Sequence, residues 1–222
     1  MSLFKPVSHI VIDSTNAYTD MCYLGKVCGT DKSPYGESNA TMHRHPYTAV
    51  YAMLFAPLRN KHIHFAEIGV AGGNSALMWL NYFRNANLYF FDRDADFLNN
   101  VKQFKIPGRD PYTGLMDVSV DGDVKIALEL ANKDAQYDVI LDDSSHEYEH
   151  QIRIIKESFP YIKPGGYMIV EDIYRTASES KYEDDLKDVI AQCALTYFVV
   201  CNHEERYSPG WNNDKLFILV KK

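Results

Sequence analysis

Apolar and polar positions follow two different periods along most of this chain. Short runs rich in β-branched and aromatic residues are separated by longer stretches whose apolar residues recur at helical spacing. The first pattern predicts strands and the second predicts amphipathic helices. We expect strands near 63–69, 88–92, 114–118, 137–142, 166–171, 197–202 and 216–220. We expect helices near 46–58, 75–83, 95–104, 123–132, 147–161 and 181–193.

This alternation predicts an α/β fold with a Rossmann-like, doubly wound sheet and helices on both faces. The loop 203–215 between the last two strands is too short for a crossover helix, so these strands should pair antiparallel. We therefore expect a seven-stranded sheet, mostly parallel, with one antiparallel strand near the C-terminus. Residues 1–222 are interpreted as a single domain, in which 1–60 form an N-terminal cap on the substrate side and 61–222 form the core.

A glycine-rich turn follows the first strand of the predicted core. The turn holds three glycines, and the helix that follows it begins at Asn74 or Ser75, both good N-cap residues. Glycine lets the backbone approach a ligand closely, and the N–H groups of a helix start attract anionic or polar groups. Loops at the carboxyl end of a first strand are where open α/β sheets bind nucleotides.

Two ligand classes compete for this turn. A dinucleotide site requires Gly-x-Gly-x-x-Gly, and from Gly69 onward the second and third glycine positions are not glycine. The alternative is an acid, Glu67, followed by Gly69 and Gly73, which resembles motif I of the class I S-adenosylmethionine (SAM)-dependent methyltransferases. Asp92 ends the next strand, roughly 20 residues after the turn, at the spacing that suits a ribose diol. We assign SAM binding to Glu67, Gly69, Gly73, Ser75 and Asp92.

Carboxylates also follow the fourth and fifth predicted strands. Asp142, Asp143 and His146 follow the fourth strand, and Glu171 and Asp172 follow the fifth. Neighbouring parallel strands bring these acids together at one edge, where they repel one another unless a cation neutralises them. Oxygen ligands favour Mg²⁺, Mn²⁺ or Ca²⁺ over zinc. The sequence thus predicts a divalent metal site at this edge, although such acids also cap helices or bind loop amides.

The combination of motifs resembles the metal-dependent macrolide sugar O-methyltransferases of the mycinamicin and macrocin type. Those motifs occupy 29–32 (Gly-Thr-Asp-Lys), 45–47 (His-x-Tyr), 56–59 (Ala-Pro-Leu-Arg), 142–146 (Asp-Asp-x-Ser-His) and 171–172 (Glu-Asp). A methyltransferase domain of a chlorovirus-like or bacterial glycan-synthesis protein falls within the same resemblance. The chain departs from the pattern at Ser144, where the family has glycine, and in lacking the family's longer N-terminal region.

The resemblance implies a role for each matching position. It implies that Asp143, Glu171 and Asp172 hold Mg²⁺ or Mn²⁺ and that His146, with Asp143, is catalytic as the general base. It further implies four cofactor contacts: Thr30, Tyr47, Asp117 and Asp142. The reaction would be methylation of a sugar hydroxyl on a glycan or glycoside, since a metal that binds a hydroxyl lowers its pKa and a histidine can take the proton. We expect the polar loops 29–39 and 174–184 to form the walls of the acceptor site.

Other activities are weaker alternatives. A catechol or caffeoyl-CoA type O-methyltransferase also uses acids after these two strands, though with Asp-Asn in place of Glu-Asp after the second. Residues 146–150 match the zinc-peptidase motif His-Glu-x-x-His, but they begin directly after a strand, where both histidines cannot share a helix face. The loop typical of N-methyltransferases that act on nucleic acid or protein is absent. A non-catalytic SAM-binding module remains a further interpretation.

Composition narrows the range of partners. The chain has 222 residues, a formal net charge of −7 and a pI of about 5.6, so it lacks the basic footprint of a nucleic-acid or anionic-membrane binder. Its four cysteines lack metal-ligand spacing, which favours reduced thiols and a cytoplasmic location. We expect a sugar or glycan acceptor as the partner, no nucleic acid and no membrane, and the sequence is compatible with a homo-oligomer.

Overall fold

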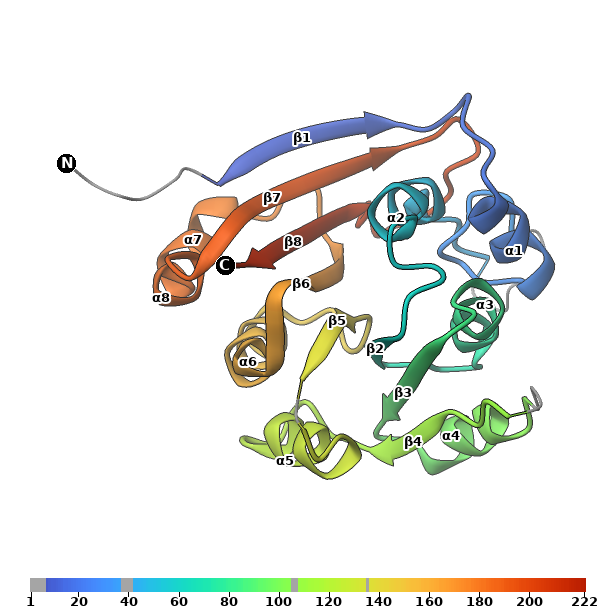
Figure 1. The fold of residues 1–222 in the computed structure, drawn as a ribbon. Helices are drawn as coiled ribbons and strands as arrows, with labels where there is room; N and C mark the ends of the chain where they lie inside the picture. Colours follow the sequence, from blue (N-terminus) through green and yellow to red (C-terminus); the bar gives the residue numbers. More distant parts are fainter. Residues whose placement is uncertain (1–6, 37–41, 105–107, 135) are drawn as a thin grey trace.

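The structure, a computed structural model, describes residues 7–36, 42–104, 108–134 and 136–222. Its strands form one sheet in the order β1-β7-β8-β6-β5-β2-β3-β4 (Figure 1). Their bounds are β1 Ser8–Asp13, β2 Ile63–Ile68, β3 Ala86–Asp92, β4 Tyr112–Leu115, β5 Tyr137–Asp142, β6 Ile162–Ile173, β7 Cys193–Asn202 and β8 Lys215–Lys221. All pairings are parallel except those of β8, which runs antiparallel to both β6 and β7.

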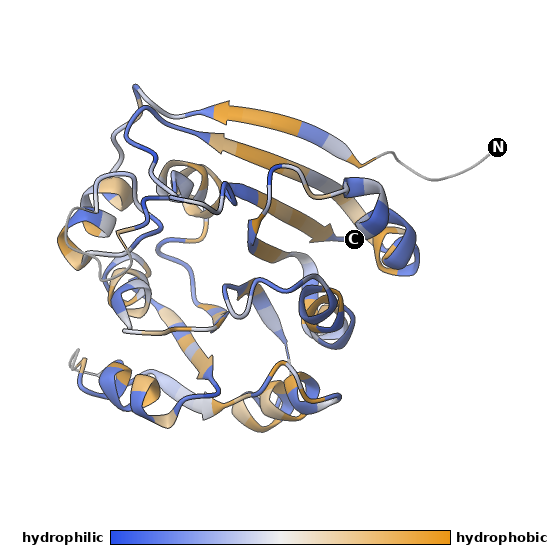
Figure 2. Ribbon diagram, turned by 180° about the vertical axis from the view of Figure 1, so that it is seen from behind, coloured by the Kyte–Doolittle hydropathy of each residue, from blue (hydrophilic) through white to orange (hydrophobic). Residues whose placement is uncertain are grey.

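Helices cover both faces of the sheet. Their bounds are α1 Asp20–Cys28, α2 Tyr47–Phe55, α3 Asn74–Tyr82, α4 Ala95–Lys102, α5 Asp123–Ala131, α6 Tyr148–Ser158, α7 Glu179–Asp185 and α8 Lys187–Ile190, with a 3-10 turn at Phe159–Tyr161. One buried apolar cluster joins α1 to α4 with the sheet, and a second joins α5 to α8 with its other face. Figure 2 shows hydrophobic residues along much of β7 and β8, while the helices carry both hydrophobic and hydrophilic residues. This arrangement confirms the predicted doubly wound α/β class.

The structure corrects the predicted sheet in three details. The sheet has eight strands and not seven, because residues 8–13 pair in parallel with β7 at its edge. The strand expected at 114–118 lies earlier, at Tyr112–Leu115. The helix expected at 181–193 is divided, since Leu186 has a non-helical backbone between α7 and α8. The predicted antiparallel strand near the C-terminus is confirmed as β8.

The central strands bring three loops to one edge. β2 lies next to β5 and β5 next to β6, with Ile68 opposite Asp142 and Asp142 opposite Val170. The loop after β5 then runs against the loop after β2, where Gly69 has a φ of 87°. A Cβ atom at Gly69 would lie 2.2 Å from the carbonyl oxygen of Asp143, so only glycine fits there. The glycine turn and the acidic loops therefore meet at a single place.

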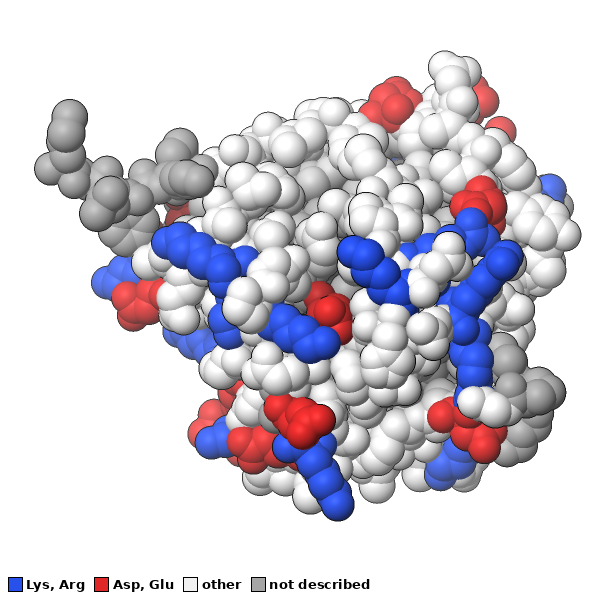
Figure 3. Space-filling view, in the orientation of Figure 1, with Lys and Arg blue, Asp and Glu red and all other residues white. Residues whose placement is uncertain are grey.

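Charge is unevenly distributed over the surface. On the face shown in Figure 3, Lys and Arg side chains gather mainly at the left and right, with further ones at the bottom and Asp and Glu side chains among them. The carboxylates of the sheet edge described above are mostly buried, among them Glu67, Asp142, Glu171 and Asp172. Within the described residues, no helix is long and apolar enough to cross a membrane.

Candidate functional site

Two hollows open at the carboxyl edge of the central strands. One, of about 370 Å³, is lined by Asp92, Asp117 and the loop after β5, and is called here the Asp92 hollow. The other, of about 390 Å³, is lined by Thr30, His146, Asp172 and Trp211, and is called the Trp211 hollow. The two share four lining residues: Gly69, Ala71, Asp143 and Ser144. Groups bound in the two hollows would therefore meet at the glycine turn.

Asp92 fixes the glycine turn from the neighbouring strand. Its Oδ2 accepts hydrogen bonds from the backbone N–H of Val70 at 2.9 Å and of Ala71 at 3.2 Å. Gly73, with a φ of 86°, stands at the N-cap of α3, and the helix starts at Asn74. The turn therefore has a fixed shape, with the start of a helix behind it, which suits the polar end of a small ligand.

Glu67 lies beneath the turn and lines neither hollow. Its carboxylate is fully buried, with Oε2 accepting a hydrogen bond from the Ser75 hydroxyl at 3.0 Å. Burial raises the pKa of Glu67 to about 7, although the nearby Lys32 ammonium works in the opposite direction. Glu67 thus supports the turn and α3 from inside, while Ser75 itself lines the Trp211 hollow.

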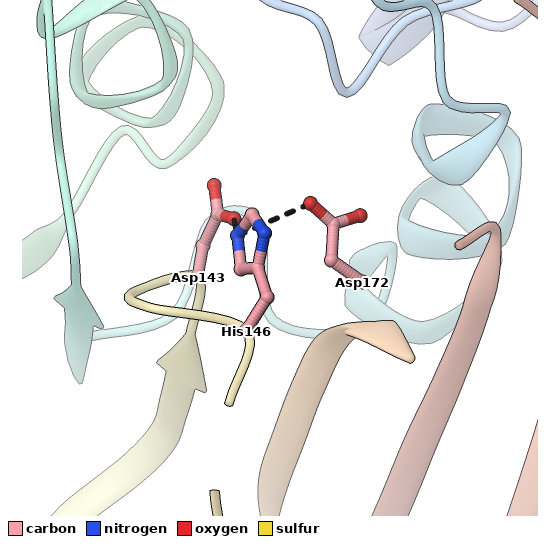
Figure 4. Close-up of side chains that lie close together, drawn as sticks. All are labelled: Asp143, His146 and Asp172. Atoms are coloured by element: carbon pink, nitrogen blue, oxygen red, sulfur yellow. Dashed lines mark hydrogen bonds and ion pairs between the residues drawn. The ribbon is translucent and has the colours of Figure 1, made fainter. Parts of the chain in front are cut away.

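Asp143, His146 and Asp172 converge where the two hollows meet (Figure 4). The His146 Nε2 lies 3.1 Å from Asp143 Oδ1 and 3.2 Å from Asp172 Oδ2. Burial disfavours the imidazolium, but the hydrogen bond to Asp143 and the charge of Asp172 outweigh it and raise the pKa of His146 to about 9. One donor atom from each of the three residues lies within 4.8 Å of the others, so the group has the compactness of a metal site.

Backbone strain accompanies this convergence. His146 has a φ of 59° and Asp172 a φ of 57°, which is the left-handed region that non-glycine residues rarely occupy. Such conformations cost about 1–3 kcal/mol each and are concentrated at functional sites. These two conformations accompany the contact between His146, in the loop after β5, and Asp172, near the end of β6.

Lys32 is a fully buried cation next to this cluster. Its ammonium binds Asp143 and Glu171, the latter at 2.6 Å, and lies 3.4 Å from Glu67. Burial works against the ammonium, but the charges of Asp143, Glu171 and Glu67 raise the pKa of Lys32 well above its usual value. The Lys32 carbonyl accepts the backbone N–H groups of Tyr47 and Thr48 at 3.1 Å, so the start of α2 holds it in place. Lys32 therefore links the acid beneath the glycine turn with Asp143, just after β5, and Glu171, near the end of β6.

Besides its contact with His146, Asp172 is held by two aromatic residues, Tyr47 and His45. The Tyr47 hydroxyl donates to Asp172 Oδ1 at 2.7 Å, and Tyr47 stacks on the His45 ring. The His45 Nδ1 lies 2.8 Å from the fully buried Asp214, and its Nε2 lies 3.7 Å from Asp172 Oδ1. Asp172 is thereby oriented by groups that precede the first central strand.

The predicted metal ligands fall into two groups. Asp143 and Asp172 face the cluster, whereas the Glu171 carboxylate points to Lys32 and accepts a hydrogen bond from the buried Tyr51 hydroxyl. His146, predicted as a general base, occupies the third position of the cluster. The ligand set of Asp143, Glu171 and Asp172 therefore stays a prediction, to which the geometry adds His146 as a competing ligand.

The predicted cofactor residues are also divided. Gly69 lines both hollows, Asp92 and Asp117 line the Asp92 hollow, and Thr30 lines the Trp211 hollow. Four line neither hollow: Glu67 and Gly73, described above, together with Tyr47 and Asp142. Tyr47 is fully buried beneath Asp172, and Asp142 is buried with its Oδ1 bonded to the backbone and hydroxyl of Ser144. The structure thus gives Tyr47 and Asp142 supporting positions. Of the expected acceptor walls, 37–39 lie outside the described residues.

Sequence reasoning assigned no role to Lys32, Tyr51 or Asp214. The signal for Lys32 was present, because it ends the Gly-Thr-Asp-Lys motif and because three buried acids need a cation. Tyr51 and Asp214 carry no such signal, since the contacts that tie them to the site, Tyr51 to Glu171 and Asp214 to His45, each join positions more than a hundred residues apart.

Known proteins are similar to this chain in sequence and in fold. Residues 66–173 match the family described as a methyltransferase domain. The 8-demethyl-8-alpha-L-rhamnosyl tetracenomycin-C 2'-O-methyltransferase of Streptomyces olivaceus is 34% identical over 155 residues, which cover 64% of this chain and 38% of that protein. The mycinamicin VI 2''-O-methyltransferase of Micromonospora griseorubida is 26% identical over 138 residues, covering 59% of this chain and 32% of that protein.

A solved structure shares the architecture. The MycE methyltransferase from the mycinamycin biosynthetic pathway, in complex with Mg, SAH and mycinamycin VI, superposes with a TM-score of 0.66 at 18% identity. The superposition covers 92% of this chain and 55% of MycE. At that identity the likeness concerns the fold. This chain spans 38% or less of the length of the two curated relatives named above.

The sheet order, the glycine turn and the family match together define the class of protein. Residues 66–173, which hold the glycine turn and the central strands, match a methyltransferase domain, and the sheet has the fold of a solved methyltransferase. Within that class, the chain is similar to sugar O-methyltransferases, which confirms the resemblance drawn from its motifs.

Proposed function

We propose that this chain transfers the methyl group of SAM to a hydroxyl of a sugar, on a glycan or glycoside, with a divalent metal and a histidine base. The observation that carries the proposal is the position of the Asp143, His146 and Asp172 cluster. It lies in the Trp211 hollow, while Asp143 also lines the Asp92 hollow on the other side of the glycine turn. The relatives that methylate a rhamnosyl or mycinamicin sugar support the acceptor class.

Each of the two hollows would hold one of the two reactants. SAM would lie in the Asp92 hollow, with its ribose toward Asp92 and its adenine toward Asp117, and its methionine end along the turn at Gly69. The acceptor sugar would lie in the Trp211 hollow. Methyl transfer needs oxygen, methyl carbon and sulfur nearly in line, which only a fixed cofactor and a fixed acceptor provide. The rigid turn and the shared residues supply that arrangement.

The residues present fit a divalent cation. Asp143 and Asp172 offer carboxylate oxygens in a compact group, and hard oxygen donors suit Mg²⁺ or Mn²⁺. They would hold the metal together with Glu171 or His146. A bound metal would lower the pKa of an acceptor hydroxyl and fix its direction.

His146 is the residue of this chain that would accept the hydroxyl proton. Its ring lines the Trp211 hollow, and its Nε2 faces both aspartates. Those aspartates raise the pKa of His146 to about 9, which favours the imidazolium. A cation held by the same carboxylates would oppose that effect and favour the neutral imidazole, which can accept a proton. The base therefore depends on the same carboxylates as the metal.

One set of assays tests the proposal. Methylation of methyl α-L-rhamnopyranoside and of a catechol is measured with SAM, first in EDTA and then with Mg²⁺ or Mn²⁺ restored. We expect sugar methylation that EDTA abolishes and metal restores, with S-adenosylhomocysteine binding unchanged in EDTA. Full activity in EDTA would remove the metal from the mechanism, and preference for the catechol would replace the sugar as acceptor.

Paired histidine variants assign the base. His146→Ala should lower the rate by about 10²–10⁴-fold, as expected for loss of a general base. His150→Ala is the comparison variant: His150 lies beside Ser145 in the Asp92 hollow and outside the cluster, so at saturating SAM it should have little effect on the rate. Mn²⁺ affinity, measured by electron paramagnetic resonance, separates the two roles of His146. Unchanged affinity in His146→Ala identifies a base, and a large loss identifies a ligand.

A further inference from the structure

A group of aromatic side chains stands at the rim of the Trp211 hollow. Trp211, in the loop between β7 and β8, is 45% exposed, and Tyr174, just after β6, is 41% exposed. Their rings are stacked at 14° with centroids 6.5 Å apart. Trp211 also meets the rings of His43 and His146 edge-on, at 5.8 Å and 6.2 Å. A large exposed indole is therefore in direct contact with the proposed base.

The loop that carries Trp211 is well anchored. The Ser208 hydroxyl donates to Asn213 at 2.6 Å, and the backbone N–H of Arg175 donates to the Asn212 carbonyl at 2.9 Å. Asn213 and the following Asp214 are fully buried. The anchors hold the loop between buried positions while the indole stays open to solvent, so the exposure of Trp211 follows from its place in the fold.

An exposed indole facing acidic groups matches one kind of ligand. A pyranose is amphipathic: its ring carbons present a face of C–H groups and its hydroxyls project from the rim. A binding hollow for such a ligand needs an apolar wall for the ring and polar groups for the hydroxyls. Trp211 supplies rigid apolar area, and Asp143 and Asp172, which line the same hollow, supply acceptors. Among the described residues that line this hollow, Trp211 is the largest aromatic side chain.

We propose that Trp211 is the platform of the acceptor site, on which the C–H face of a pyranosyl group stacks while one rim hydroxyl faces His146. This inference rests on the proposed sugar methylation. It makes Trp211 a specificity-determining residue that acts on acceptor binding, with SAM bound independently in the Asp92 hollow.

The fluorescence of Trp211 can report acceptor binding directly. The chain has two tryptophans, and Trp79 is fully buried in the core while Trp211 is exposed. Methyl α-L-rhamnopyranoside added to the protein with S-adenosylhomocysteine and Mg²⁺ should change the emission of Trp211. The change should be absent in Trp211→Phe, which keeps an aromatic ring in place but leaves only Trp79 to report.

Steady-state kinetics supply the second measurement. Trp211→Ala should raise the KM for the sugar about tenfold or more, because removing a stacked anchor weakens binding. Its kcat should stay within about twofold and its affinity for SAM should be unchanged, and Trp211→Phe should recover part of the KM. Tyr207→Ala is the matched control, since Tyr207 is an exposed aromatic of the same loop that lines neither hollow. It should leave the KM unchanged.

The outcomes separate this inference from the function on which it rests. A wild-type enzyme that methylates the sugar, combined with a normal KM in Trp211→Ala, overturns the platform and leaves the function intact. Equal loss of SAM affinity in that variant also overturns it, because Trp211 would then serve the cofactor. A wild-type protein that methylates only the catechol overturns the proposed function and the pyranose platform together.

Discussion

Replacing Lys32 by methionine tests whether the buried ammonium holds the site together. Methionine keeps the length of the side chain but removes the charge that binds Asp143, Glu171 and Glu67. Removing one partner of a buried ion pair costs about 3–5 kcal/mol, because the remaining charge stays buried without compensation. For a domain of this size, each kcal/mol lowers the Tm by about 2–4 °C, so the expected fall is about 6–20 °C.

The loss of stability in Lys32→Met should depend on pH in a defined direction. The pKa of Glu67 is already raised to about 7 by burial, and removing the Lys32 charge raises it further. A folded pKa above the unfolded one means that the carboxyl imposes no penalty below the unfolded pKa of about 4.3 and a growing penalty as pH rises toward the folded pKa. Lys32→Met should therefore be less destabilised at pH 5 than at pH 8.

Urea unfolding at pH 5, 6.5 and 8, in EDTA, measures both effects. Lys163→Met is the matched control, because Lys163 binds Asp138 at 2.7 Å in a partly exposed pair. Such a pair contributes about 0–1 kcal/mol. The reasoning fails if Lys32→Met is as stable as Lys163→Met, or if its deficit is larger at pH 5 than at pH 8.

Three further predictions concern the turn, the cluster and the cofactor. Gly69→Ala should abolish S-adenosylhomocysteine binding in calorimetry and lower the Tm, because the new Cβ would lie 2.2 Å from a carbonyl oxygen. Gly72→Ala has open space at its Cβ and should be tolerated, so equal effects of the two substitutions would contradict the prediction. Tyr47→Phe removes a donor to buried Asp172, so it should cost about 1–3 kcal/mol in urea unfolding and weaken Mn²⁺ binding; normal values for both would show that Tyr47 is dispensable. SAM at a hundred times its Kd should stabilise the protein by about 2.7 kcal/mol in thermal unfolding, and stabilisation by NAD alone would contradict the assignment of the turn.

The class of fold was predictable because its signal is local. Central strands such as β2 and β5 are buried on both faces and appear as apolar runs, and the helices between them show a regular apolar spacing. The edge strand β1 does not follow this rule. Most of its residues are exposed, and only its pairing with β7 makes it a strand. The run at 9–12 is β-like by composition, but the sequence does not show that it joins the sheet, because its pairing with β7 joins segments far apart in the chain.

The sequence predicts which carboxylates form the site, but it does not predict which way each side chain points. Parallel strands place Asp143, Glu171 and Asp172 at one edge, as the sequence indicates. Which acid of the Glu171 and Asp172 pair faces the cluster depends on a φ of 57° at Asp172. It depends equally on Lys32, which binds Glu171 from 139 positions away. Neither the backbone angle nor the distant partner is encoded in the motif itself.

The strained geometry at Asp172 explains why residues before the first central strand belong to the site. A left-handed aspartate persists only where its surroundings compensate for about 1–3 kcal/mol of strain. Tyr47 provides such compensation, because its hydroxyl donates to the Asp172 carboxylate and accepts the Asp172 backbone N–H at 3.3 Å. Tyr51 and Lys32 hold Glu171 in the other direction. Because all three groups precede residue 61, the core strands alone would bring the acids to one edge without deciding which of them faces Asp143 and His146.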